Sequence, residues 1–201
     1  MVKQQIQGWS LIAGAAISMI VSTYAFFAND LDSAPILVLS IAGNILLIWG
    51  VFAIQSFQPQ IGFWGKCALV LICLELVSYT GMTILQLENS SGMTLHALLV
   101  VGLNSLILNY LELPIAASYI LVGWLTSRAQ VFPAWAGWFL MVSGFLRIAS
   151  SLYVSFAPLN LGQDSVSMLF YLLLPLLNVV AWAGYGLEII KKARYPKGGF
   201  A

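Results

Sequence analysis

Six long apolar stretches, separated by short polar segments, dominate the chain. A helix needs about 20 predominantly apolar residues to cross the hydrocarbon core of a bilayer. Apolar residues make up 61% of the 201 positions and charged residues 7%, a composition that does not suit a soluble domain. The sequence therefore predicts an all-α, polytopic membrane helical bundle with six transmembrane helices. These helices are expected near residues 9–29, 35–56, 62–87, 95–127, 132–157 and 165–190.

The segments between the stretches are too short to hold a second domain. Each contains about ten residues or fewer, so residues 1–201 are predicted to form a single transmembrane domain. The apolar run that follows Lys3 continues to about Ala28 and exceeds the core of a cleavable signal peptide. We therefore expect this run to be retained as the first helix.

Basic residues fall on one side of the predicted helices and acidic residues on the other. The positive-inside rule places the basic side, which carries both termini, in the cytoplasm. All seven tryptophans lie in the helix halves nearer the basic side, as expected of interfacial anchors. The basic residues concerned are Lys3, Lys66, Arg128, Lys191, Lys192, Arg194 and Lys197.

Glu75, Glu112 and Arg147 each lie near the middle of a predicted helix. An ionisable side chain at that depth costs a few kcal/mol or more unless it is paired, protonated or hydrated. Such residues usually face the interior of a bundle, where they mark ligand sites, ion paths or counter-ions. These three residues are therefore the first place to look for function.

Other polar side chains share this depth. Asn109, Glu112 and Tyr119 follow one another at helical spacing and predict an inward polar face, and Glu75 and Tyr79 do the same one helix earlier. The sequence thus predicts one polar cluster near the midplane. Its candidate ligand-binding or proton-linked residues are Glu75, Glu112, Arg147, Asn44, Asn109, Asn178, Tyr79 and Tyr119.

Two interpretations of this cluster stay open. It can be an interhelical staple that fixes the packing of the bundle, since polar contacts across membrane helices serve that purpose. Alternatively, two carboxylates and one guanidinium leave a surplus charge, which protonation normally removes when it is buried. We expect Arg147 to pair with Glu112, because Pro114 loosens the backbone there, and Glu75 to be the group that binds a proton. The cluster would then bind or transport a small, lipophilic or weakly polar molecule.

A non-catalytic accessory or assembly subunit of a larger membrane complex is the alternative function, and a homo-oligomer is compatible with either.

An enzyme is disfavoured, because no catalytic or nucleotide-binding motif is present. The single histidine, His96, gives no metal-ligand cluster or haem pair, so no metal or cofactor is expected. Cys67 and Cys73 fall on different faces of one predicted helix and are not placed for a disulfide. A formal charge of +1 gives no sign of nucleic-acid binding.

A run in the second half of the chain carries a resemblance to a known group of proteins. Its residues are Leu121, Gly123, Arg128, Phe132, Pro133, Trp135, Gly137, Trp138 and Gly144, followed by Trp182, Ala183, Gly184 and Tyr185. In these residues, and in length and helix spacing, the chain resembles the small six-span membrane proteins of unknown function that are common in bacteria. The resemblance implies six helices and the bacterial inner membrane. It implies no activity and no site residues.

Overall fold

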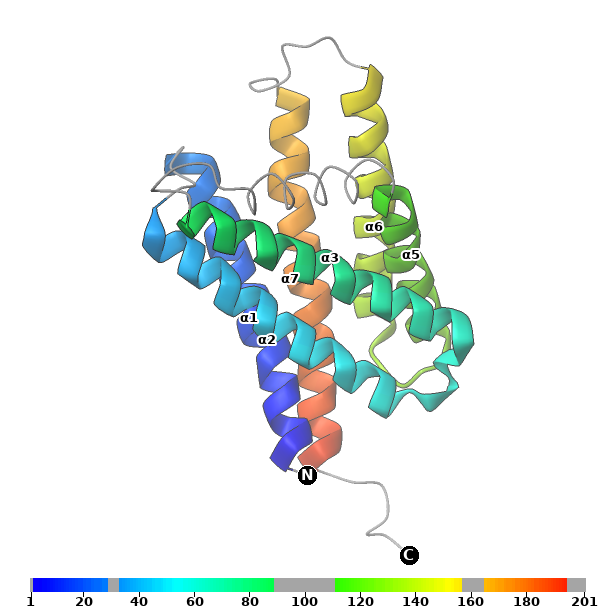
Figure 1. Ribbon diagram of the computed structural model, residues 1–201. Coiled ribbons are helices and arrows are strands. Elements are labelled where there is room, and N and C mark those ends of the chain that lie inside the picture. The colour runs from blue at the N-terminus through cyan, green and yellow to red at the C-terminus, as the bar shows by residue number, and fades with distance from the viewer. Residues whose placement is uncertain (1, 29–32, 89–110, 157–164, 195–201) are drawn as a thin grey trace, which may run out of the picture.

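The computed structural model of the chain describes residues 2–28, 33–88, 111–156 and 165–194 (Figure 1). Every regular element within these ranges is helical. Five of the helices contain a segment long and apolar enough to cross a membrane, so the chain is an integral membrane protein. The elements are α1 (Val2–Ala28), α2 (Ala34–Phe57), the 3₁₀ turn η1 (Pro59–Ile61), α3 (Gly62–Glu88), α5 (Glu112–Arg128), α6 (Ala134–Phe156) and α7 (Ser165–Arg194).

The helix boundaries differ from the predicted ones mainly at the two chain ends. The first helix begins at Val2 instead of residue 9, and the last continues to Arg194 instead of residue 190. Glutamine, lysine and arginine are good helix formers, and Gln7 is buried, so these polar turns extend the helices rather than end them. The predicted fourth helix is described only as α5, and its earlier part, which includes His96 and Asn109, lies outside the described residues.

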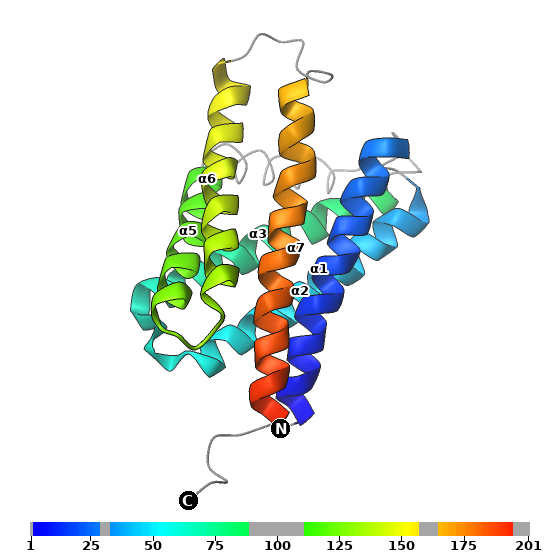
Figure 2. The same ribbon diagram turned by 180° about the vertical axis from the view of Figure 1, so that it is seen from behind.

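The six described helices form a closed ring. α1 packs on α2 and α7, α2 on α3, α3 on α5, α5 on α6, and α6 on α7. Figures 1 and 2 show α2 and α3 running obliquely past the more upright α1, α6 and α7. The first turns of α1 and the last turns of α7 lie side by side at one end of the ring. We call this the terminal end.

Glycines set the closest approaches between helices. A Cβ atom on Gly123 would lie 2.5 Å from the carbonyl oxygen of Gly137, and one on Gly137 would lie 2.5 Å from that of Gly123. The same mutual contact joins Gly8 of α1 to Gly186 of α7, at 2.8 and 2.6 Å. Because membrane helices associate largely through close packing, such small residues let the backbones of α5 and α6, and of α1 and α7, meet directly.

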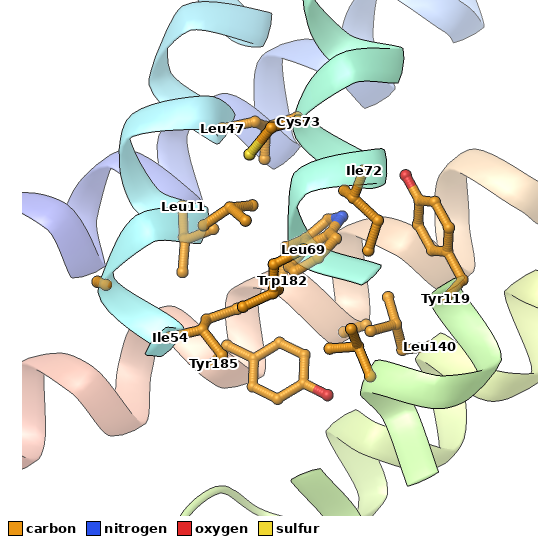
Figure 3. Close-up of a cluster of buried hydrophobic side chains, with 14 of the residues drawn as sticks. Leu11, Leu47, Ile54, Leu69, Ile72, Cys73, Tyr119, Leu140, Trp182 and Tyr185 are labelled. Carbon is orange, nitrogen blue, oxygen red and sulfur yellow. The ribbon is translucent and has the colours of Figure 1, made fainter. Parts of the chain in front are cut away.

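A packed apolar core fills the half of the ring nearer the terminal end. Leu11, Ile54 and Leu140 are among its fully buried side chains (Figure 3). Tyr185 is also fully buried, and its hydroxyl lies 2.6 Å from Oγ1 of Thr126. This hydrogen bond satisfies the polar groups that α5 and α7 bring into the core.

The turns at the terminal end are tied together by polar side chains. The Gln58 amide, just before η1, donates a hydrogen bond to the carbonyl oxygen of Leu125 at 3.2 Å. Lys192 of α7 donates to the carbonyl oxygen of Val131, in the α5–α6 turn. The α2–α3 turn, the α5–α6 turn and the end of α7 therefore close this end of the ring.

The tryptophans do not all serve as interfacial anchors. Trp182 is only 3% exposed and lies within the core cluster, where Figure 3 shows it between Leu69 and Tyr185. The prediction that all seven are anchors is therefore wrong for Trp182. Position along a helix sets the depth of a side chain, but the helix face decides whether it meets lipid or protein. The exposed tryptophans are Trp9, Trp49, Trp64, Trp124, Trp135 and Trp138.

Candidate functional site

The centre of the site is an ion pair between Glu75 of α3 and Arg147 of α6. Nη1 of Arg147 donates to Oε1 of Glu75, whose residue is only 3% exposed. The hydroxyl of Tyr119, on α5, donates to the other carboxylate oxygen at 2.9 Å. The guanidinium carbon of Arg147 also lies 4.5 Å from the centre of the Tyr119 ring, within the range of a cation–π contact. Three helices thus converge on one carboxylate.

The expectation that Arg147 pairs with Glu112 is wrong, and so is the expectation that Glu75 is the unpaired carboxylate. Glu112 is half-buried in the first turn of α5. Tyr119, which contacts Arg147, comes seven residues later, roughly 10 Å along the helix. The pairing is set by the level at which α3, α5 and α6 meet. Spacing within one helix does not reveal that level.

A cavity of about 280 Å³ lies beside the ion pair, in the half of the ring away from the terminal end. Residues from all six described helices line it. Six of the eight predicted site residues are among them, whereas Glu112 is not, and Asn109 lies outside the described residues. The six are Asn44, Glu75, Tyr79, Tyr119, Arg147 and Asn178.

A second polar pair links α6 to α7 at the cavity. The hydroxyl of Ser143, which is fully buried, donates to Oδ1 of Asn178 at 2.6 Å. Three residues before Asn178, Pro175 lies inside α7 and also lines the cavity. Because proline has no backbone N–H, the carbonyl of residue 171 lacks its usual helical partner one turn away.

Several polar groups at the cavity have no protein partner among the described residues. Asn44 is only 8% exposed as a residue, and no described residue forms a hydrogen bond with its amide. The hydroxyls of Ser18, Ser22 and Ser40, on the same side of the cavity, form none either. Nε of Arg147 is buried and has no acceptor. A buried polar group without a partner is costly, so these atoms favour a wet or occupied cavity over a dry one.

Sequence reasoning missed part of the lining. Ser18 and Ser22 follow Gly14 at steps of four, and this small-residue spacing predicts helix packing. Gly14 does pack on Gly43 of α2, but the two serines line the cavity. The sequence could have predicted that Ser40 lines the cavity, because Ser40 precedes the deep Asn44 by one helical turn and so shares its face.

The described residues offer no site for a metal ion. No three histidine, cysteine, aspartate or glutamate side chains come together within those ranges. Cys67 and Cys73 are free thiols. The chemistry available at the cavity is therefore hydrogen bonding, one neutralised ion pair and aromatic contact.

Comparison of the chain with protein-family models, with curated proteins and with solved structures gave no match. The geometry of the cavity is therefore the only guide to the function of the chain.

Proposed function

We propose that this integral membrane protein is a six-span bundle whose central cavity binds, and through that binding transports, a small lipophilic or weakly polar molecule. The observation that carries the proposal is the Asn44 amide, which lies at the cavity in a buried residue and has no hydrogen-bond partner among the described residues. Ligand pockets typically measure about 300–1,000 Å³ and combine apolar walls with a few placed polar groups. At about 280 Å³ this cavity suits a ligand at the small end of that range.

The shape of the ring favours a carrier over an open pore. The apolar core around Leu11, Ile54 and Tyr185 separates the cavity from the terminal end. The Gln58 and Lys192 hydrogen bonds tie the turns beyond that core. A ligand leaving toward the terminal end would require these contacts to open, as in alternating access around a fixed midplane site.

Proton coupling is not part of the proposal. Both oxygens of Glu75 accept hydrogen bonds, one from Arg147 and one from Tyr119. In this arrangement the Glu75 carboxylate serves as the counter-ion of the Arg147 guanidinium and is not a surplus charge. The surplus carboxylate, Glu112, does not line the cavity.

Filling the cavity should abolish ligand binding. Leucine at Ser40 would push apolar atoms into the cavity, whereas leucine at Ser56, on an exposed face of the same helix, would not. In native mass spectrometry of protein released from its own membrane in mild detergent, we expect wild type and Ser56→Leu to carry a bound small molecule. Ser40→Leu should be empty.

Two outcomes of that experiment would contradict the proposal. One is a small molecule bound equally to Ser40→Leu, which would place the ligand elsewhere. The other is a stoichiometric protein partner with no small molecule. That result would identify an accessory subunit, and the Glu75–Arg147 pair would be a staple between helices.

The proposal includes the orientation, with both termini in the cytoplasm of a bacterial cell. Exposed Lys3, Lys66, Arg128 and Lys191 support it, because the positive-inside rule assigns their end to the cytoplasm. A fluorescent protein that folds only in the cytoplasm should therefore be bright when fused at either terminus. A periplasm-dependent phosphatase should be inactive at both. The reverse pattern would show the opposite topology.

A further inference from the structure

We propose that the cavity selects an electrically neutral, flat molecule that carries a hydrogen-bond acceptor such as an amide or ketone carbonyl. This inference rests on the proposed binding function and deepens it by assigning a chemical class to the ligand. Three features of the lining carry it: its charge balance, its supply of hydrogen-bond donors and its aromatic wall.

The charge balance excludes an ionised ligand. Glu75 and Arg147 are the only charged side chains among the described residues that line the cavity, and they pair with each other. An anion would compete with Glu75 for Arg147, and a cation would compete with Arg147 for Glu75. Either would leave one buried charge without compensation, which is strongly unfavourable in a site of low polarity. A neutral ligand leaves the pair intact.

The donors exceed the acceptors. Arginine has five N–H donors and no acceptor. Only Nη1 of Arg147 forms a hydrogen bond with a described residue, and Nη2 forms none. Each carboxylate oxygen of Glu75 already accepts one hydrogen bond, and Oδ1 of Asn178 accepts from Ser143. A ligand with a hydrogen-bond acceptor therefore satisfies more of the unbonded groups than a ligand with only donors.

Asn44, on α2, also lines the cavity and can both donate and accept. An amide or ketone oxygen of the ligand can accept a hydrogen bond from the N–H₂ group of Asn44. An amide N–H of the ligand can donate one to the Asn44 carbonyl. The unpartnered hydroxyls of Ser18 and Ser40 offer the same choice on α1 and α2. These groups suit a molecule whose polar atoms are neutral.

The lining also contains aromatic and aliphatic side chains. Trp182 packs edge to face on Tyr119, with ring centres 6.2 Å apart, and both side chains line the cavity. Leu47, Pro175 and Val179 contribute further apolar atoms. Aromatic walls of this kind favour a planar body through stacked or edge-to-face contacts.

Three probes of one shape test the inference, since benzamide is neutral, benzoate is an anion and benzamidinium is a cation. Their binding to the protein in lipid nanodiscs is followed by saturation-transfer NMR, with empty nanodiscs as the background. We expect benzamide to bind most tightly. Asn44→Ala should weaken benzamide about tenfold, the loss expected for one hydrogen bond in a desolvated site. Ser56→Ala, away from the cavity, should have no effect.

Asn44→Ala should fold normally, because Asn44 forms no hydrogen bond with a described residue. As a second variant, Arg147→Lys keeps the positive charge for Glu75 but removes Nε and the planar fork, so it should also weaken benzamide.

The outcomes separate this inference from the function on which it rests. Tighter binding of benzoate or benzamidinium would overturn the neutral class while leaving a binding cavity in place. Benzamide binding that is unchanged in both Asn44→Ala and Arg147→Lys would likewise overturn it. If none of the probes binds and native mass spectrometry finds no bound molecule, the binding function itself is wrong. If native mass spectrometry does find a molecule, a formal charge on it would overturn the class, and a neutral carbonyl compound would support it.

Discussion

Replacing Glu75 with glutamine is expected to lower the free energy of unfolding by about 2–3 kcal/mol, because it leaves the Arg147 guanidinium buried without a counter-ion. The Arg147 side chain is 18% exposed, so water in the cavity should moderate the loss. The measurement is a titration with sodium dodecyl sulfate in mixed micelles, followed by circular dichroism. Glu112→Gln is the matched control and should change the stability little, since Glu112 is only half-buried and does not pair with Arg147.

Removing Arg147 and removing Glu75 should not lower the free energy of unfolding by the same amount. Arg147→Met leaves a carboxyl that can bind a proton and become neutral, whereas a guanidinium cannot lose its charge. We therefore expect a smaller loss for Arg147→Met than for Glu75→Gln. The double variant Glu75→Leu with Arg147→Met should recover much of the stability, because apolar replacement of a whole buried pair is often neutral. A coupling energy for Glu112 and Arg147 as large as that for Glu75 and Arg147 would contradict the pairing.

The second large effect is expected at the contact between α5 and α6. Gly123→Ala would place a Cβ atom 2.5 Å from the carbonyl oxygen of Gly137, a backbone atom that cannot turn away. The two helices would have to separate along their contact, and we expect a loss of about 2–3 kcal/mol in the same titration, in the upper part of the range for overpacking.

Gly81, in α3, is the control for this substitution. A Cβ atom there would meet no described residue within 4 Å, and alanine is the better helix former by up to about 1 kcal/mol. Gly81→Ala should therefore leave the protein as stable as wild type or slightly more so. Equal losses at Gly81 and Gly123 would show that the cost comes from losing glycine in general. It would then have nothing to do with the approach of α5 to α6.

The positions of the helices followed from the sequence because the bilayer imposes a minimum apolar length. Long apolar runs such as 35–56 and 62–87 became α2 (Ala34–Phe57) and α3 (Gly62–Glu88), with shifts of only one residue. The end at Val2 was missed because the turn around Gln7 is polar. This turn has no hydrophobic pattern of its own. It is helical because it packs against the rest of the protein.

The residues of the site were largely predictable, but their pairing was not. The depth of Glu75 and Arg147 can be counted along each helix, and that count placed both near the midplane. Which carboxylate meets the guanidinium depends on how the oblique α3 crosses α6 and α5 (Figure 1). The crossing is decided by contacts such as Gly65 of α3 on Leu125 of α5, which join residues of different helices.

The face that each helix presents was predicted unevenly for a similar reason. Hydrophobic periodicity is informative when one side of a helix meets water, but in a membrane both lipid and core are apolar. Trp182 and the exposed tryptophans therefore look alike in sequence, as do a serine that packs and one that lines a cavity, such as Ser22.

The contact between Gly8 and Gly186 makes α1 depend on α7, which is synthesised later. At a translation rate of about 5–20 residues per second, roughly 10–30 s separate the emergence of α1 from that of α7. During that interval the α7-facing side of α1 has no α7 against which to pack, and the cavity lacks the wall that contains Asn178 and Trp182. The ring can close only after α7 has left the ribosome. A truncation within α7 should therefore leave a nascent protein that membrane quality-control proteases recognise.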